Sequence, residues 1–377
     1  MKKIVLLAHV LVLLSTAVVI GFVRPAVAQG TIYIRANGLV EGTDKIVSVD
    51  NVTYTFTDNI YDEIQIERNN TVLDGAGYTV QGTGSGVGIE LYYTSNVTIK
   101  NTQVKAFWVG IHLASASNNS ISGNNVTNNG GNGIEVSYSS NNTIYGNNIA
   151  ENGNGIVLYG SPCVNNKLYH NNIMNNTNQV YHYTVSTNVL DNGYPSGGNH
   201  WSDYNGTDAN QDGIGDTSYT IVAGTTQDEY PLMGPISFFD AGTWNEITYY
   251  AHTVSNSTVS DFYFSESEKL ISFNVTGLDD TVGFCRVAIP NDLLWCDNPE
   301  QWQIWANNTL IEDRNVMEDT SYVYIYFTYN QSTQNVEVIG VHAIPEFSAL
   351  ASMLLILIML TIGIAIYKRR LLKTPIH

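Results

Sequence analysis

The sequence predicts an all-β protein, in which a right-handed parallel β-helix with three strands per coil is followed by a small β-sandwich and one C-terminal transmembrane helix. A repeat of 22 or 23 residues, longer alternating strands after residue 236 and an uncharged apolar run near the C-terminus predict this arrangement. The expected domains are a signal peptide (1–28), an N-terminal cap (29–63), the β-helix (64–200), a closing segment (201–235), the sandwich (236–343), a sorting motif with the transmembrane helix (344–367) and a basic cytoplasmic tail (368–377).

The N-terminus has the pattern of a secretory signal peptide. Lys2 and Lys3 precede an apolar stretch, residues 4–20, and Ala26 and Ala28 fit a small-x-small cleavage signature. An uncleaved membrane helix is the alternative. In either case we expect the chain to be exported.

The repeat begins with the pattern Gly-Ile-x-(Leu/Val), which starts at Gly88, Gly110, Gly133 and Gly155. A second short strand follows about eight residues after each start, a third follows it, and Asn, Gly and Ser occupy the turns. Stacking roughly six such coils would build a continuous Ile, Leu and Val core. Asparagines recur at equivalent turns, where we expect inward-facing ladders: Asn119, Asn142 and Asn166 in one, Asn124, Asn147 and Asn171 in another.

These coils, with the closing stretch from Gly198 to Asp208 and the run from Asp228 to Leu232, resemble the parallel β-helix repeats of NosD-type periplasmic copper-binding proteins and of many archaeal surface proteins. The resemblance covers about residues 60–235. It implies the fold but not the activity, because this architecture is reused for unrelated purposes.

The closing segment contains a loop with the ligand spacing of a calcium site. Oxygen donors stand at its positions 1, 3, 5, 7 (a backbone carbonyl) and 9, which are Asp208, Asn210, Asp212, Ile214 and Asp216. Tyr219 occupies the place of the bidentate glutamate of an EF-hand, so a helix-free calcium loop, similar to those of dockerin or thrombospondin repeats, is predicted. The alternative is a hydrogen-bonded turn that needs no metal.

Copper would need imidazole or sulfur ligands in a cluster. The β-helix and closing segment offer four histidines, His112, His170, His182 and His200. Their spacing gives no reason to expect them to converge, so the sequence does not favour copper.

One group of residues is a candidate for catalysis. Glu90 and Glu135 hold the same strand position two coils apart, with His112 between them, so the three would form an outward stripe about 10 Å long. Polysaccharide lyases and uronate epimerases need such acid and base groups in a cleft. A solvated strand face explains the stripe equally well, and the sequence offers no other catalytic set.

Residues 236–343 lose the Asn/Gly period and contain about seven longer alternating runs, which is typical of a small sandwich. Trp295, Trp302 and Trp305 are candidates for a sugar-stacking platform or for core packing. Cys285 and Cys296 could form a disulfide, or all three cysteines could be free.

The apolar run 347–367 is long enough to span a bilayer, and Lys368, Arg369 and Arg370 after it would stay on the cytoplasmic side. We therefore expect the body at the extracellular face of the cell membrane. Pro345, Glu346 and Phe347 resemble the sorting signal of archaeal surface proteins. This resemblance implies an archaeosortase-like processing enzyme and a lipid that replaces the helix.

The formal net charge of −18 disfavours nucleic acid as a partner. Several Asn-x-Ser/Thr sequons are candidate glycosylation sites in an exported chain. The sequence thus favours a non-catalytic surface protein with a structural, adhesive or glycan-binding role, whose partners are surface glycans or other envelope proteins. Two alternatives stay open: a polysaccharide lyase or epimerase, and a NosD-like copper-binding or metal-delivery protein.

Overall fold

The computed structural model describes residues 30–182, 187–221, 226–344, 357–362, 364 and 366. The predicted signal peptide, sorting motif and basic tail lie outside these residues, as do 13 of the 21 residues of the predicted transmembrane run 347–367. Residues 357–362 are helical. In the part of the chain that is described, no helix is both long and apolar enough to cross a membrane.

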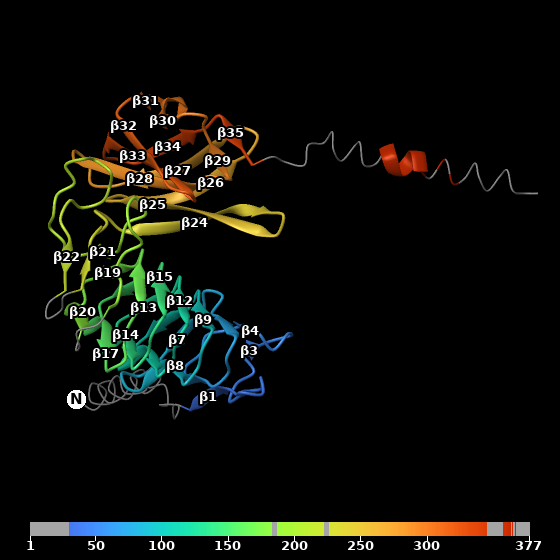
Figure 1. Cartoon of the computed structure of the whole chain (residues 1–377), viewed down its shortest axis with the longest axis vertical. Helices are drawn as coiled ribbons and strands as arrows, with labels where there is room; N and C mark the ends of the chain where they lie inside the picture. The colour runs from blue at the N-terminus through green and yellow to red at the C-terminus, as the bar shows by residue number, and fades with distance from the viewer. Residues whose placement is uncertain are drawn as a thin grey trace, which may run out of the picture.

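The N-terminal half of the chain winds into a parallel β-helix whose strands form three sheets (Figure 1). The first sheet runs in the order β2 (Val40–Glu41), β1 (Thr31–Ile34), β5 (Glu63–Ile66), β8 (Val87–Tyr92), β11 (Val109–Ala114), β14 (Asn132–Ser137), β17 (Asn154–Tyr159) and β20 (Asn178–His182). The second runs β3 (Ile46–Val47), β4 (Thr53–Phe56), β6 (Thr71–Asp74), β9 (Val97–Lys100), β12 (Ser120–Ser122), β15 (Thr143–Tyr145) and β18 (Lys167–Tyr169). The third runs β7 (Thr79–Gln81), β10 (Gln103–Lys105), β13 (Asn125–Thr127), β16 (Asn148–Ala150), β19 (Asn172–Met174) and β21 (His200–Trp201).

The register of the first sheet confirms the predicted repeat. Each isoleucine of the Gly-Ile pattern pairs with the isoleucine one coil away, and the side chains stack in the interior: Ile64, Ile89, Ile111, Ile134 and Ile156 are all at most 1% exposed. Burial of one such side chain contributes about 1.5–3 kcal/mol, so the core grows with every coil added. β1 already pairs in parallel with β5, so the first coil starts inside the segment that the sequence analysis assigns to a cap.

The glycine of the repeat is required by close packing of the backbones. A Cβ on Gly88 would lie 2.6 Å from the carbonyl oxygen of Gly110, and the same clash recurs at 2.6 Å between Gly110 and Gly133. Only a residue without a side chain permits this approach. The Gly-Ile pattern therefore reflects two packing requirements: the glycine leaves room for the neighbouring backbone, and the isoleucine fills the core.

Buried asparagines form the predicted ladders along the turns. In the ladder of Asn119, Asn142 and Asn166, each side-chain amide donates to the Oδ1 of the next asparagine, at 3.1 and 2.9 Å. The ladder of Asn124, Asn147, Asn171 and Asn199 repeats this pattern at 2.9–3.0 Å. A third ladder that the sequence analysis did not identify comprises Asn129, Asn152 and Asn176. Each rung satisfies backbone groups that the turns leave unpaired.

Asp228 ends the second ladder. Its Oδ2 accepts hydrogen bonds from the backbone N–H of Asn199 at 2.7 Å and from the indole N–H of Trp201 at 2.9 Å, and its Oδ1 accepts from the backbone N–H of Tyr230. Burial raises the pKa of the Asp228 carboxyl to about 7, against the opposing effect of these donors. The closing segment, which includes β22 (Tyr219–Thr220) and β23 (Gln227–Asp228), thus places its acceptor where the next asparagine would stand.

The C-terminal part is a sandwich of two five-stranded antiparallel sheets, as the sequence predicts. One runs β24 (Ile236–Trp244), β25 (Ile247–Ser255), β28 (Val282–Pro290), β33 (Tyr322–Asn330) and β32 (Arg314–Glu318). The other runs β26 (Thr258–Ser265), β27 (Leu270–Thr276), β34 (Gln334–Ile339), β30 (Gln303–Ala306) and β31 (Thr309–Ile311). β29 (Leu294–Trp295) pairs with β35 (His342–Ala343), and a 3-10 turn spans Pro299–Gln301.

Several sandwich side chains settle questions that the sequence left open. Trp302 is 3% exposed and belongs to the core, so it cannot serve as a stacking platform for a sugar. Trp295 stacks on His342, with ring centroids 5.4 Å apart. Cys163, Cys285 and Cys296 are free.

The sandwich is fixed to the β-helix through β24. The Asn172 side chain both donates to the Ile236 carbonyl, at 2.9 Å, and accepts from the Ile236 N–H, at 2.8 Å. Nearby, Arg286 of β28 is 1% exposed, donates to the Pro195 carbonyl and lies 4.2 Å from the Tyr324 ring centroid. The two parts therefore share a buried, specific junction.

Candidate functional site

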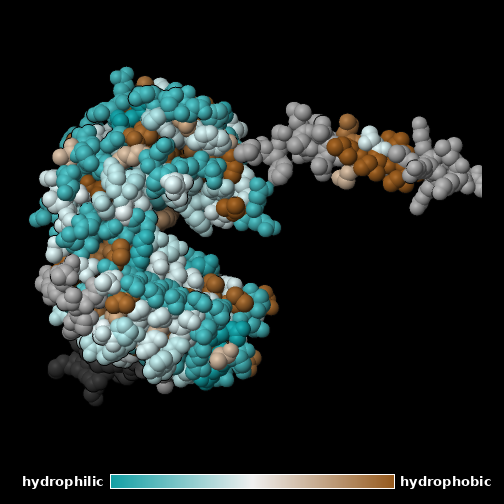
Figure 2. All heavy atoms as spheres, in the orientation of Figure 1, coloured by the Kyte–Doolittle hydropathy of each residue, from teal (hydrophilic) through white to brown (hydrophobic). Residues whose placement is uncertain are grey.

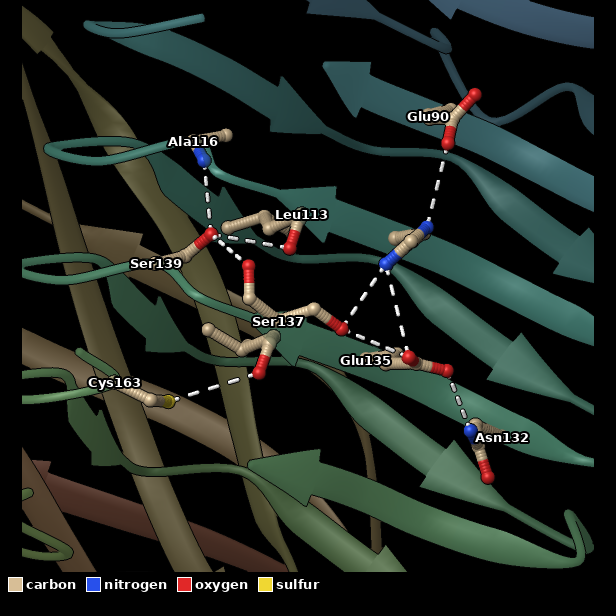
Figure 3. A network of polar contacts seen from close by, with 10 residues as sticks. Glu90, Leu113, Ala116, Asn132, Glu135, Ser137, Ser139 and Cys163 are labelled. Carbon is tan, nitrogen blue, oxygen red and sulfur yellow. Dashed lines mark hydrogen bonds and ion pairs between the residues drawn. The ribbon is translucent and has the colours of Figure 1, made fainter. Parts of the chain in front are cut away.

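The structure brings Glu90, His112 and Glu135 together on the outer face of the first sheet, as their repeat positions predict. Glu90 and Glu135 are labelled in Figure 3. They lie side by side on β8, β11 and β14. The His112 Nδ1 is 3.4 Å from Glu90 Oε1, and its Nε2 is 3.7 Å from Glu135 Oε1. The three side chains are 19–29% exposed, so the stripe is accessible from outside.

Neighbouring polar groups hold Glu135 in place. The Asn132 amide donates to its Oε2 at 2.7 Å, and the Ser137 hydroxyl donates to its Oε1 at 2.8 Å. The same hydroxyl lies 3.2 Å from His112 Nε2. Figure 3 shows these contacts as one network that spans three coils. The site is a pre-positioned set of carboxylate and imidazole groups, which can accept from and donate to hydroxyls.

A further carboxylate adds negative charge beside the stripe. Glu63, at the start of β5, has a raised carboxyl pKa, chiefly because of burial and also because of the charge of Glu90. Since carboxylates dominate this face, it disfavours a polyanionic ligand.

Exposed tyrosines border the stripe, and the sequence analysis did not identify them. Tyr92 and Tyr159 end β8 and β17, and Tyr93 and Tyr138 stand in the turns that follow β8 and β14. Their exposures run from 41% for Tyr159 to 68% for Tyr93. Tyr138 and Tyr159 meet edge to face, with centroids 5.6 Å apart. The available signal was a tyrosine directly after the Gly-Ile-x-Leu pattern in two repeats.

A tryptophan lies near the opposite end of the same strands. Trp108, directly before β11, is 58% exposed. It packs over Gly131, where a Cβ would lie 2.7 Å from the indole. The acidic stripe is thus flanked by aromatic side chains at both strand ends. Aromatic faces next to hydrogen-bonding groups are suited to rings that carry hydroxyls.

The predicted calcium loop is compact, and its own backbone uses most of its carboxylate oxygens. Asp208 accepts from the N–H groups of Asp212 and Gly213, at 3.0 and 2.8 Å. Asp212 accepts from the Ile214 N–H at 2.8 Å and from the Asn210 side chain at 2.9 Å. Among the described residues, no group of three or more His, Cys, Asp or Glu side chains is arranged to hold a metal ion.

The loop nevertheless concentrates negative charge. Burial raises the pKa of the Asp208 carboxyl, and the charges of Asp212 and Asp216 raise it further, against two backbone hydrogen bonds that lower it. The oxygen-only donor set suits a hard cation such as calcium. Arg286 packs under Gly213 and supplies positive charge from below.

The four histidines weighed for copper are dispersed. His112 lies in the stripe, His182 ends β20, and His200 is 3.3 Å from the Leu232 carbonyl oxygen. His170 is buried at the junction, 5.2 Å between ring centroids from His252 of the sandwich. The sequence analysis did not predict this last pair. Arg286 stands close to both rings and disfavours a metal cation there.

Comparison with known proteins bears on the β-helix. Residues 26–206 match the family model described as a periplasmic copper-binding protein (NosD). Together with the three parallel sheets, this match decides the type of fold. The coils form a parallel β-helix that is similar to the NosD family over these residues. The match covers slightly less than half of the chain and ends before the loop 208–216 and the sandwich. No curated protein matches the chain.

Among solved structures, the chain is similar to phage tailspikes. The Dettilon tailspike gp208 is 13% identical with a TM-score of 0.24, and the match covers 74% of this chain and 68% of that one. The enzymatically active domain of bacteriophage CBA120 tailspike protein 2 is 12% identical with a TM-score of 0.28, and the match covers 76% of this chain and 59% of that one. A likeness this distant says nothing about what the present chain binds or cleaves.

Proposed function

We propose that this chain is an exported, membrane-anchored surface protein whose β-helix binds glycans without cleaving them. The observation that carries the proposal is the stripe of Glu90, His112 and Glu135 between exposed aromatic side chains. Carboxylate and imidazole groups recognise sugar hydroxyls, and tyrosine rings pack against sugar faces. Export and anchoring rest on the signal-peptide pattern and on the apolar run followed by basic residues.

Binding fits the stripe better than hydrolysis does. A glycosidase places its two carboxyl groups on either side of the scissile bond, with room for the sugar between them. Here the imidazole of His112 fills that space and contacts both glutamates. A lyase or epimerase is the alternative, and it would use His112 or a glutamate as the base.

Removal of a tyrosine beside the stripe tests the proposal. On an array of surface polysaccharide fragments, we expect the full chain in detergent to retain a subset of glycans. Tyr159→Ala should weaken their binding at least tenfold, because a ring face is lost. Tyr263→Ala, which removes a 60% exposed tyrosine from the sandwich, is the matched control and should bind as the wild type does. Equal binding by both variants, or no glycan retained by the wild type, would contradict the proposal.

We also propose that the loop 208–216 binds calcium as a structural ion. The ion would offset the burial of the Asp208 carboxylate, which chiefly raises its pKa, and its repulsion by Asp212 and Asp216. A ligand at 100 times its Kd stabilises the folded state by about 2.7 kcal/mol, so millimolar calcium should raise the Tm by several degrees over EDTA. Asp216→Asn should reduce that rise. The same Tm in calcium and in EDTA would contradict the site, and the loop would then be a metal-free turn.

A further inference from the structure

A cleft lies between the β-helix and the sandwich, away from the stripe. The second and third sheets form its lower wall, and β24, β25 and Tyr322 of β33 form the upper one. Figure 2 shows the molecule hollowed below the hairpin of β24 and β25. The volume is about 870 Å³, which falls within the usual size of ligand sites in proteins. The cleft shares no lining residue with the stripe, so a ligand in the cleft does not require the function proposed for the stripe.

Aromatic rings from both parts line the cleft. Tyr145 comes from the β-helix, and Phe238 and Tyr250 come from the sandwich; these three are 36–49% exposed. Tyr145 is held by parallel stacking on Tyr169, with centroids 5.5 Å apart and planes 10° apart. Phe238 lies over the turn glycine Gly146, where a Cβ would stand 3.3 Å from its ring. These rings therefore present fixed faces to a ligand.

The remaining lining is rich in amides and has little net charge. Five asparagines contribute: Asn101, Asn124, Asn125, Asn148 and Asn172. Two charged residues contribute as well. Lys100 is paired with Asp74, with 3.2 Å between its Nζ and the Asp74 Oδ2, and the Asp240 carboxylate accepts from the Gly242 N–H. The lining thus offers both donors and acceptors but no surplus of either charge.

This chemistry selects a class of ligand. Aromatic faces match the C–H faces of sugar rings, and amides match hydroxyl edges that both donate and accept. An anionic chain would find Lys100 already paired with Asp74, and a cationic chain would find only the single carboxylate of Asp240. We propose that the cleft binds an uncharged oligosaccharide.

The cleft is already formed before any ligand arrives. The two hydrogen bonds between Asn172 and Ile236 fix β24 against the coil, and Arg286 and the ring of Tyr324 are buried behind it. Because no domain closure is needed, little ordering entropy is lost on binding. The proposed site is therefore rigid and open on one side.

The test uses the full chain in detergent and an array of uncharged gluco-, manno- and xylo-oligosaccharides, with oligouronates as charged counterparts. Calorimetry then measures the Kd of the best uncharged probe. We expect Tyr250→Ala and Asn125→Ala to raise this Kd at least tenfold. Tyr263→Ala, on the neighbouring strand outside the cleft, should leave it unchanged, and so should Tyr159→Ala beside the stripe.

The outcomes separate the two proposals. Loss of binding in Tyr250→Ala with retention in Tyr159→Ala supports the cleft. Loss in Tyr159→Ala with retention in Tyr250→Ala supports the stripe and overturns the cleft. A preference for oligouronates, or no binding of any uncharged probe, also overturns it. Since Tyr250 is half exposed and not part of the core, an unchanged Tm for Tyr250→Ala confirms that the fold is intact.

Discussion

Asn147→Ala should lower the free energy of unfolding by about 2–6 kcal/mol, which is a large fraction of the stability of a typical domain. The Asn147 side chain donates to the Ile121 carbonyl at 2.8 Å and to Asn171 Oδ1 at 2.9 Å. It also accepts from the backbone N–H and the side-chain amide of Asn124, both at 3.0 Å. Without it, at least two buried polar groups lose their partners, and each such loss costs about 1–3 kcal/mol.

The matched control is Asn154→Ala. Asn154 belongs to an outward-facing row of asparagines and bonds to Asn132 and Asn178, each at 2.8 Å. Because water can replace these partners, its loss should change stability by less than about 1 kcal/mol. Urea denaturation of both variants at one pH measures the difference. If Asn147→Ala proves as stable as Asn154→Ala, the buried ladder does not contribute as argued.

The junction between β-helix and sandwich should weaken as the medium becomes acidic. Burial lowers the pKa of His170 from 6.5 to about 4, and burial lowers the pKa of His252 well below 6.5. The unfolded chain binds these protons more readily than the folded chain does. The folded state therefore keeps its full stability, as far as these two histidines are concerned, above pH 6.5. Their contribution is lost as the pH falls through the lowered pKa values. For His170 alone the loss is about 3 kcal/mol by pH 4, equivalent to a Tm drop of roughly 5–10 °C.

The groups that face the two rings reinforce this expectation. Arg286 on β28 and Lys167 on β18 carry positive charge toward them, and Tyr322 and Tyr324 on β33 offer neutral rings. The Ser196 carbonyl, 3.0 Å from His170 Nε2, opposes the shift but does not outweigh burial. A proton added here therefore joins an existing buried cation.

A difference measurement isolates the histidines from Asp228. The pKa of Asp228 is raised to about 7, so its contribution has the opposite sign: it is fully present below pH 3.8 and is lost as the pH rises through 7. Both the wild type and the double variant His170→Phe/His252→Phe retain Asp228. We expect the Tm of the double variant to fall less than that of the wild type between pH 7 and pH 4. Parallel Tm profiles for the two proteins would contradict the assignment.

The sequence predicted the β-helix and the stripe for the same physical reason. In a parallel stack, residues at the same repeat position become neighbours, so Ile89 meets Ile111 and Glu90 meets His112. The period alone therefore supplies tertiary contacts. The end of the stack also depends on a glycine. A Cβ on Gly198 would lie 1.8 Å from Asp228 Oδ1, so only a residue without a side chain leaves room for Asp228.

The histidine pair at the junction and the exposed tyrosines depend on contacts that do not follow the 22- or 23-residue repeat. His170 and His252 are far apart in the sequence and meet only because β24 is fixed to Asn172, a contact that no repeat position records. Tyr92 and Tyr159 occur in two repeats only, because a solvent-exposed strand end imposes no packing demand. The sequence left open whether Cys285 and Cys296 pair, because no repeat position bears on that contact, and both thiols are free.

The carboxylate of Asp228 has a consequence for how long such a rod can become. Every asparagine in its ladder both receives from the previous coil and gives to the next, so any coil can follow any other. A carboxylate only receives, so elongation stops at whichever coil meets it. Duplication or deletion of one repeat unit before Gly198 would leave this terminus intact and change the rod by one strand spacing, about 4.8 Å. The length of the β-helix can thus change in fixed steps, while the last coil, Asp228 and the junction to the sandwich stay together as one unit.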